Sequence, residues 1–318
     1  MSLPDLTPPE PRSAAMKAVL QLCACFAMSC YPFLLLGESG TGKSWLARQI
    51  HDMSHVRNGP WVETHTPRLE ELGTSLLQGH ARGAFTGAVQ THHGLIEDAA
   101  GGTLFVDEIG TASSRLQELL VTLVEAAAFR PLGARRDVPA TARFIFATNE
   151  PLAQRVSEES FREDFYHRIS AFKVTLPPLR ERREDIPALS EYFLAIESRK
   201  HERPTPTLSR GAMERLVDAE WRGNLRELRM TLVRSLLLSV GRHTLEADNL
   251  DFDPLPPRPA VTSRTPLTFA NVRRALAVSG GNRRAAARSL GCSERQLYRV
   301  ISSMSDETEP DEPISESA

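Results

Sequence analysis

The stretch Gly37-Glu38-Ser39-Gly40-Thr41-Gly42-Lys43-Ser44 matches the phosphate-loop pattern G-x-x-x-x-G-K-[ST]. It follows the apolar run 33–36 and precedes a helical pattern, which is the context that the motif requires. The glycines allow the backbone to close around phosphate oxygens, so that consecutive N–H groups point inward. We therefore predict an ATP site in which Lys43 reaches the β- and γ-phosphates and Ser44 ligates Mg²⁺.

Two adjacent acids follow a second apolar run, residues 103–106. Asp107 is placed to orient Mg²⁺ and its waters, and Glu108 can polarise a water for in-line attack on the γ-phosphate. Adjacent acids after a strand are also common as solvated turns. The position of this pair downstream of Lys43 in an alternating β/α chain favours the catalytic interpretation.

Short apolar runs alternate with helical patterns between residues 13 and 176, and a third run occupies 143–147. Such alternation predicts the α/β class, with a parallel sheet covered by helices on both faces. The third run leads into Thr148 and Asn149. We predict that these side chains hydrogen-bond the γ-phosphate or the attacking water; the alternative is a helix cap after the strand.

Composition and charge divide the rest of the chain. Hydrophobic residues make up 41% of the 318 residues and charged residues 25%, which excludes a mainly disordered or fibrous protein. We predict a flexible lead-in at 1–12, the α/β core at 13–176, a small all-helical lid at 177–250, a Pro-rich linker at 251–267, a helical module at 268–304 and a disordered acidic tail at 305–318.

The carboxy-terminal charges are strongly segregated, although the net charge of the whole chain is only −2. Residues 268–304 carry seven arginines and one acid, whereas residues 305–318 carry six acids and no base. A basic module followed by an acidic tail is typical of proteins that bind nucleic acid. We therefore expect double-stranded DNA to be a partner of this module.

The basic module reads as three helices with short turns. A helix at 269–278 ends at Gly280-Gly281, Asn282 caps a second helix at 283–290, and Ser293 opens a third. This is the helix-turn-helix pattern, although a basic bundle that merely dimerises is the alternative. We predict phosphate contacts from Arg283, Arg284 and Arg288, and a groove-facing helix carrying Ser293, Arg295, Gln296 and Arg299.

The hexamer Gly83-Ala84-Phe85-Thr86-Gly87-Ala88 has no periodicity that a core would use, and it predicts an exposed, mobile loop that contacts a partner. It resembles the signature loop of bacterial enhancer-binding proteins, the AAA+ activators of sigma-54 RNA polymerase. The resemblance covers about 15–304. Further motifs that look like those of the family lie at 80–82, 101–109, 161–168, 176–182 and 221–228.

The resemblance implies an AAA+ core, a helical lid and a Fis-type DNA-binding domain. Arg162 and Arg168 would be arginine fingers that enter a neighbouring subunit's site, and Arg226 would be the lid arginine on the bound nucleotide. The implied assembly is a hexameric ring, formed alone or with a paralogue. The implied partners are sigma-54 RNA polymerase holoenzyme and an upstream DNA site. The lead-in is too short to be a receiver or sensor domain, so we expect neither ahead of the core.

Two positions depart from the family pattern. Thr64 stands where the family usually has an Asn that pairs with the catalytic Glu, and its reach is shorter. Leu76-Leu77-Gln78-Gly79 replaces the usual Glu-Leu-Phe-Gly ahead of the signature loop. Both changes bear on how nucleotide state would be coupled to the loop.

No membrane span or signal peptide is expected, because the apolar stretch 19–36 is interrupted by polar residues and a proline and lacks a basic flank. A cytoplasmic location follows from this. Cys23, Cys25 and Cys30 are too few for a disulfide scaffold, and we expect reduced thiols on a buried helix face rather than a metal site.

The leading hypothesis is therefore an ATP-hydrolysing transcription activator. A DNA-binding regulator that uses nucleotide only to oligomerise is one alternative, against which the intact set Lys43, Asp107, Glu108 and Arg162 argues. A general AAA+ remodelling chaperone is another, against which the intact loop and the helix-turn-helix pattern argue.

Overall fold

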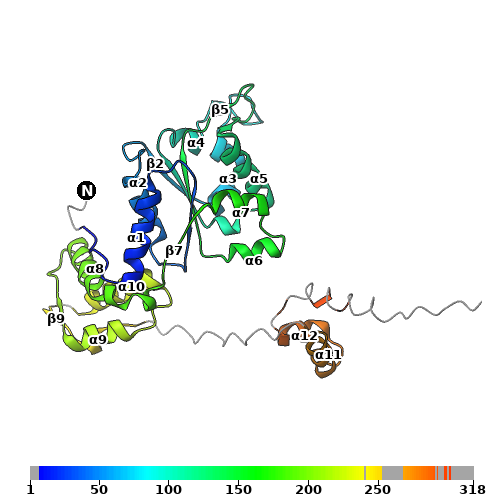
Figure 1. Cartoon of the computed structure of the whole chain (residues 1–318). Coiled ribbons are helices and arrows are strands. Elements are labelled where there is room, and N and C mark those ends of the chain that lie inside the picture. Colours follow the sequence, from blue (N-terminus) through cyan, green and yellow to red (C-terminus); the bar gives the residue numbers. More distant parts are fainter. Residues whose placement is uncertain are drawn as a thin grey trace, which may run out of the picture. The chain divides into compact units, whose positions relative to one another are not determined.

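The computed structural model describes residues 7–239, 241–252, 268–290, 292, 297–298 and 301, which belong to two compact units divided after Phe252 (Figure 1). The first unit contains an α/β core and a lid, and the second contains the basic helices.

A five-stranded parallel sheet forms the core, in the order β2-β3-β6-β1-β7. Its strands are β1 (Phe33–Leu36), β2 (Trp61–His65), β3 (Thr103–Asp107), β6 (Arg143–Thr148) and β7 (Phe172–Thr175). The predicted α/β class is confirmed, and the three apolar runs form the strands β1, β3 and β6. The edge strand β7 was not predicted, because it has only two apolar residues, Phe172 and Val174.

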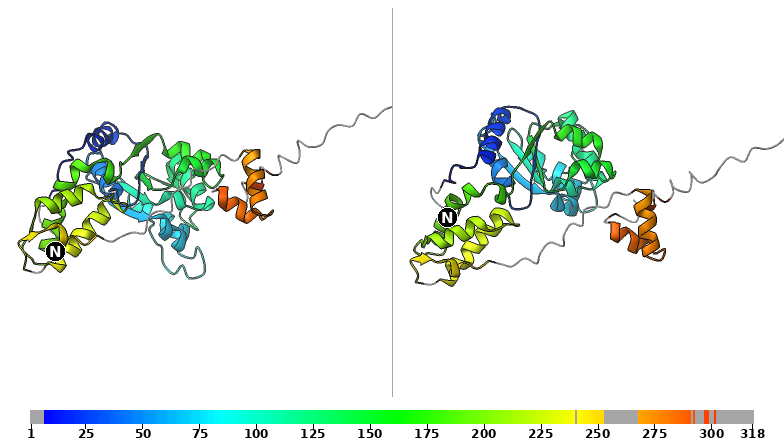
Figure 2. Two further views of the ribbon diagram at one scale, coloured as in Figure 1. Left: turned by 90° about the horizontal axis from the view of Figure 1, so that it is seen from below. Right: turned by 60° about the horizontal axis from the view of Figure 1, so that its bottom comes forward.

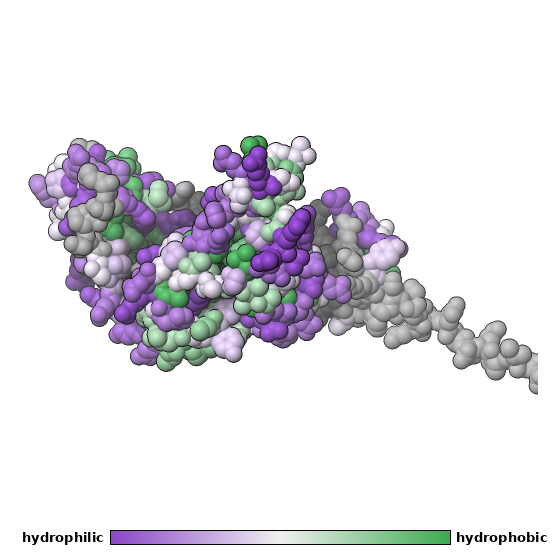
Figure 3. All heavy atoms as spheres, turned by 90° about the horizontal axis from the view of Figure 1, so that it is seen from above, coloured by the Kyte–Doolittle hydropathy of each residue, from purple (hydrophilic) through white to green (hydrophobic). Residues whose placement is uncertain are grey.

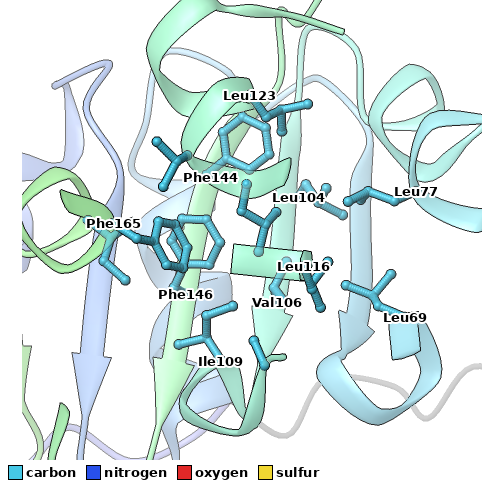
Figure 4. Close-up of a cluster of buried hydrophobic side chains, with 14 of the residues drawn as sticks. Leu69, Leu77, Leu104, Val106, Ile109, Leu116, Leu123, Phe144, Phe146 and Phe165 are labelled. Atoms are coloured by element: carbon cyan, nitrogen blue, oxygen red, sulfur yellow. The ribbon is translucent and has the colours of Figure 1, made fainter. Parts of the chain in front are cut away.

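Helices cover both faces of this sheet (Figure 1). Successive side chains of a strand point to opposite faces, so Leu34 packs with α3 (Thr66–Gln78), α5 (Ser114–Ala126) and α7 (Glu163–Ile169) on one side. Figure 4 shows part of this cluster, including Leu104, Phe146 and Phe165. Phe33 and Leu35 pack on the other side with α1 (Ala14–Ala27) and α2 (Lys43–Asp52). Shorter elements between them are α4 (Leu95–Asp98), η1 (Ile109–Thr111), β4 (Ala128–Phe129), β5 (Val138–Pro139) and α6 (Leu152–Ser157).

The lid has its own hydrophobic core, centred on the buried Trp221. Its elements are η2 (Leu179–Glu181), η3 (Arg183–Asp185), α8 (Ile186–Lys200), β8 (Thr207–Leu208), α9 (Arg210–Asp218), α10 (Asn224–Leu238), β9 (Thr244–Leu245) and η4 (Ala247–Asn249). The prediction of a wholly helical lid is wrong in one respect, because β8 and β9 pair in parallel. Two-residue strands are too short to show an alternating pattern in the sequence.

The second unit contains α11 (Phe269–Val278) and α12 (Arg283–Leu290), as the sequence predicted. Asn282 caps α12, since its Oδ1 accepts a hydrogen bond of 3.1 Å from the backbone N–H of Ala285. Val272 packs with Ala286 and Leu297 in a small core. Ser293, Arg295, Gln296 and Arg299 lie outside the described residues, as does the side chain of Arg288.

Within the described part of the chain, no helix is long and apolar enough to cross a membrane. The three clustered cysteines do not share a buried face as expected. Cys23 is buried, which raises the pKa of its thiol to about 12, but Cys25 and Cys30 are exposed. Cys25 lies two positions after Cys23 on α1 and therefore points to another side of the helix, and Cys30 follows the end of α1.

Candidate functional site

Most of the residues predicted to hold the nucleotide meet at the carboxyl end of the sheet, where parallel strands bring their following loops together. The phosphate loop leaves β1, Asp107 ends β3, and Asn149 follows β6. A cavity of about 190 Å³ lies between them. Its lining residues are Ser39, Gly40, Gly42, Lys43, Ser44, Trp45, Asp107, Glu108, Asn149 and Arg226.

The phosphate loop requires its glycines for conformation and for space. Gly40 and Gly42 have φ angles of 77° and 105°, which residues with a side chain rarely adopt. A Cβ on Gly40 would also lie 2.3 Å from the carbonyl oxygen of Gly223 in the lid. The lid backbone therefore packs directly on the loop, and Leu225 N–H donates a 2.9 Å hydrogen bond to the Gly40 carbonyl.

Lys43 is the first residue of α2, and its side chain extends back across the phosphate loop. Its Nζ donates hydrogen bonds to the carbonyl oxygens of Gly37 at 2.9 Å and Glu38 at 3.1 Å. Burial lowers the pKa of Lys43, while the Asp107 carboxylate raises it and Arg226 lowers it further. An anion such as phosphate in the cavity would favour the charged ammonium.

The two acids have different local settings. The Asp107 Oδ1 accepts a 2.8 Å hydrogen bond from the backbone N–H of Glu108. Glu108 has a left-handed backbone, with φ of 60°, which is strained for a residue with a side chain. Its carbonyl accepts hydrogen bonds of 2.9 Å from both the N–H and the hydroxyl of Thr111. The chain therefore turns sharply at Glu108 and leaves both acids on the cavity.

The structure separates the Thr148 and Asn149 pair. Asn149 lines the cavity, but Thr148 is fully buried at the end of β6 and is not part of the lining. The Thr148 hydroxyl accepts a 2.9 Å hydrogen bond from the Glu150 N–H. Strand alternation explains the difference, because neighbouring side chains point in opposite directions.

Several polar side chains of the lid contact the phosphate loop, and Arg226 is the one that the sequence predicted. Arg226 Nη1 donates to the Ser39 hydroxyl at 2.9 Å. Arg180 forms a two-pronged pair with the Glu38 carboxylate, with both N–O distances 2.8 Å. Asn224 Nδ2 donates to the Ser39 carbonyl at 3.0 Å, and Arg182 donates to that of Thr41 at 2.6 Å. Arg180, Arg182 and Asn224 lie within the motifs at 176–182 and 221–228, which indicated the segments but not their partners in the phosphate loop.

A larger and mostly apolar pocket of about 510 Å³ adjoins the phosphate loop and shares Trp45 and Arg226 with the smaller cavity. Its walls are α8, α10 and residues 8–11, which run along the lid ahead of α1 (Figure 2). Asp185 fixes this segment, because its carboxylate accepts hydrogen bonds from the N–H groups of Arg12 at 2.6 Å and Ser13 at 2.8 Å. Residues 1–12 were predicted to be a flexible lead-in, but residues 8–11 form a wall of this pocket.

Arg162 and Arg168 do not line the cavity of their own chain. Arg162 pairs with Asp164 through bonds of 3.0 and 2.7 Å, and this hydrogen-bonded pair lowers the pKa of Asp164. Arg168 donates to Glu125 at 2.8 Å, and both arginine side chains are about half exposed. Their placement leaves them accessible to another molecule.

The departure at Thr64 has a structural counterpart. Thr64 is buried in β2, and its hydroxyl has no hydrogen-bond partner among the residues that the structure describes. Thr66 instead donates from its hydroxyl to the Asp107 carbonyl at 3.2 Å. In the part of the chain that the structure describes, the Thr64 hydroxyl forms no hydrogen bond with Glu108.

The segment between α3 and α4 projects from the first unit (Figure 2, left). Within it, Gly83 N–H donates to the Ala88 carbonyl at 2.8 Å, which closes the predicted loop on itself. The Phe85 ring is 48% exposed and contacts the His80 ring edge-on, with centroids 4.9 Å apart. Figure 3 shows one face of the molecule, on which hydrophilic residues predominate and hydrophobic patches lie between them.

Residues 76–79, which depart from the family pattern, form the end of α3 at the base of this loop. Leu77 is buried, and the Gly79 carbonyl accepts a 3.0 Å hydrogen bond from Leu132 N–H.

In the second unit, the Arg283 guanidinium lies 4.9 Å from the centre of the Tyr298 ring, and Arg283 and Arg284 are both exposed.

Comparison with known proteins gives consistent matches along the chain. A family model described as the Sigma-54 interaction domain matches residues 10–175, and one described as the AAA+ ATPase lid domain matches 180–264. The transcriptional regulatory protein GlrR of Escherichia coli K12 is 35% identical over 300 residues, covering 92% of this chain and 66% of GlrR. ZraR of Klebsiella oxytoca is 36% identical over 298 residues, covering 91% of this chain and 67% of ZraR.

Among solved structures, NtrX from Brucella abortus in complex with ATP has a TM-score of 0.68 and 29% identity, covering 94% of this chain and 69% of NtrX. The ADP complex of the same protein has a TM-score of 0.68 and 28% identity, covering 92% and 68%. The chain spans about two thirds of the length of these relatives.

Proposed function

The chain belongs to the Sigma-54 interaction domain family, and from this premise we propose that it hydrolyses ATP to activate transcription by sigma-54 RNA polymerase. One observation carries the proposal: Lys43, Asp107 and Glu108 line a single cavity at the end of the sheet, beside Arg226 of the lid. These are the charged groups that phosphoryl transfer requires.

The phosphates of ATP would lie in the smaller cavity, held by the loop N–H groups and the Lys43 ammonium. Ser44 and Asp107 line the same cavity and offer a hydroxyl and a carboxylate, which are the oxygen ligands that suit Mg²⁺. When bound there, Mg²⁺ would neutralise charge on the phosphate oxygens. Glu108 would accept a proton from the attacking water, which Asn149 would help to orient.

The adenine base would lie in the larger pocket. This pocket is mostly apolar, adjoins the phosphate loop through Trp45, and is closed by residues 8–11 and the lid. The flat aromatic faces of adenine fit such a lining, and the related NtrX structures hold ATP and ADP. Nucleotide would then contact core and lid together, so that its hydrolysis changes how the two are held.

Arg162 and Arg168 would complete a neighbouring subunit's site in a ring, six-membered by resemblance. Their exposure and their absence from their own cavity support this arrangement. Arginine supplied by a neighbour stabilises charge on the transferring phosphoryl group and accelerates hydrolysis by about 10³- to 10⁵-fold.

The loop 83–88 would contact sigma-54. Replacing Phe85 with Ala should leave most ATP hydrolysis intact but abolish opening of a sigma-54 promoter, because the exposed ring lies outside the nucleotide cavity. Hydrolysis and promoter melting are measured on the same preparation, with exposed Leu72→Ala in α3 as the control. Equal loss of both activities would make the loop a structural part of the active site instead.

The second unit would bind double-stranded DNA. Replacing Arg283 and Arg284 with Ala should weaken binding to any duplex and reduce the slope of log K against log salt by about 2, because each phosphate contact releases roughly one counterion. Fluorescence anisotropy at salt concentrations between about 50 and 200 mM measures the slope, because DNA affinities that depend on phosphate contacts fall by orders of magnitude over this range. The control is Arg210→Ala, an exposed arginine of the lid. An unchanged slope would contradict phosphate contact by these arginines.

A further inference from the structure

Gln117 is a buried amide in the middle of the core that the nucleotide chemistry above does not use. It lies on α5, is 1% exposed and lines neither of the two cavities described above. Buried side-chain amides need hydrogen-bond partners. The partners of Gln117 are all backbone groups of two loops far apart in the sequence.

One of these loops is the turn that follows the catalytic acid. The Gln117 Nε2 donates to the Ala112 carbonyl at 2.8 Å. Ala112 in turn donates its N–H to Ile109, and Thr111 donates to Glu108, so the turn is continuous from Glu108 to the amide.

The other loop carries the proposed arginine finger. Gln117 Oε1 accepts a 2.7 Å hydrogen bond from the Arg162 backbone N–H, and its Nε2 also donates to the Ser160 carbonyl at 3.4 Å. The amide therefore links residue 112 to residues 160–162, because Nε2 donates to both segments and Oε1 accepts from Arg162.

A second side chain makes the same connection independently. Arg155 on α6 donates from Nη1 to the Gly110 carbonyl at 2.5 Å and from Nε to the Ser160 hydroxyl at 3.3 Å. The Arg155 carbonyl also accepts the N–H groups of Ser160 and Phe161 at 2.9 and 3.1 Å. Two links thus join the turn after Glu108 to the loop before Arg162.

Aromatic packing fixes the remaining side of the finger segment. Phe161 and Phe165 flank Arg162 and stack at 5.4 Å, and Phe165 meets Phe146 of β6 edge-on at 5.7 Å. With its helix held on the sheet, the backbone at Arg162 is set by the polar links to residues 110–112.

We propose that Gln117 and Arg155 are positioning residues. They tie the backbone at the arginine finger, Arg162, to the turn that follows Glu108, so that this turn sets where the finger stands when it enters a neighbouring subunit's site. This inference rests on the proposed function. It makes each finger responsive to the nucleotide site of its own chain, because Glu108 begins the turn to which the finger is tied.

The first test is Gln117→Met, which keeps side-chain length and removes the hydrogen bonds. We expect KM for ATP to stay within about twofold, because the variant's own cavity is intact, and kcat to fall by about 10²-fold, the effect of a misplaced catalytic group. Gln21→Met, the same change at an exposed position of α1, should leave both constants unchanged. A kcat near the wild-type value would overturn the proposal.

Mixing experiments separate positioning from general damage. Gln117→Met has an intact phosphate loop and lacks a placed finger, whereas Lys43→Ala has the reverse, so their mixture should recover activity. A mixture of Gln117→Met with Arg162→Ala should recover none. Arg155→Met removes the other link and gives the same comparison if Gln117→Met does not fold by circular dichroism.

The mixture of Arg162→Ala with Lys43→Ala is measured alongside. If that pair fails to recover activity, the proposed shared site is wrong and the positioning role falls with it. If that pair recovers but Gln117→Met and Arg155→Met do not recover with Lys43→Ala, the shared site stands and the positioning proposal alone is wrong.

Discussion

Glu108→Gln is expected to bind ATP with nearly unchanged affinity and to hydrolyse it about 10²- to 10⁴-fold more slowly, the usual contribution of a general base. The substitution keeps the shape of the side chain and removes its ability to accept a proton. Groups that hold the nucleotide, Lys43 and the loop backbone, are untouched. Binding is measured with a fluorescent ATP analogue and turnover by phosphate release.

Lys43→Ala provides the contrast, because it removes the ammonium beside the phosphates and should weaken binding itself. Retention of near-wild-type hydrolysis by Glu108→Gln would show that another group activates the water. Asn149, which shares the cavity but cannot accept a proton at neutral pH, would not be a sufficient replacement.

Arg162→Ala and Arg168→Ala are each expected to lower hydrolysis by about 10³-fold or more, at the scale of an arginine finger supplied from a neighbour. Each substitution should leave nucleotide binding by its own chain intact, since neither arginine lines the cavity. Wild-type activity per chain should also rise with protein concentration as subunits assemble.

Complementation measures whether the site is shared. Mixing Arg168→Ala chains with Lys43→Ala chains should restore part of the activity, because one supplies the phosphate loop and the other the finger. Arg242→Ala, a lid arginine outside both pockets, is the control for loss of a positive charge. Full activity in a strict monomer would place every catalytic group within one chain.

Local motifs were sufficient to predict three of the five strands of the sheet and most of the residues that line the smaller cavity. A strand that ends in Asp107 and a glycine loop that ends in Lys43 each specify their own geometry, and parallel pairing brings them together. Thr148 was assigned with Asn149 because they are adjacent in sequence, yet strand alternation buries one and presents the other.

The contacts that the sequence analysis missed join segments far apart in the chain. The Arg180–Glu38 pair spans 142 positions and the Asp185–Ser13 bond spans 172. In the sequence, Gln117 looks like any polar residue of an amphipathic helix. Only the folded structure shows that it is buried and which backbone groups it bonds. A single sequence carries no periodic or spacing signal for such tertiary hydrogen bonds.

Residues 8–11 form a wall of the larger pocket, and Asp185 ties the following residues to the lid. This placement matters for laboratory work on the protein. An affinity tag fused ahead of residue 7 would be joined directly to that wall, and the bulk and charge of the tag would act on the space proposed for adenine. Nucleotide affinities and inhibitor screens should therefore use protein from which an amino-terminal tag has been cleaved, with the tagged form measured for comparison.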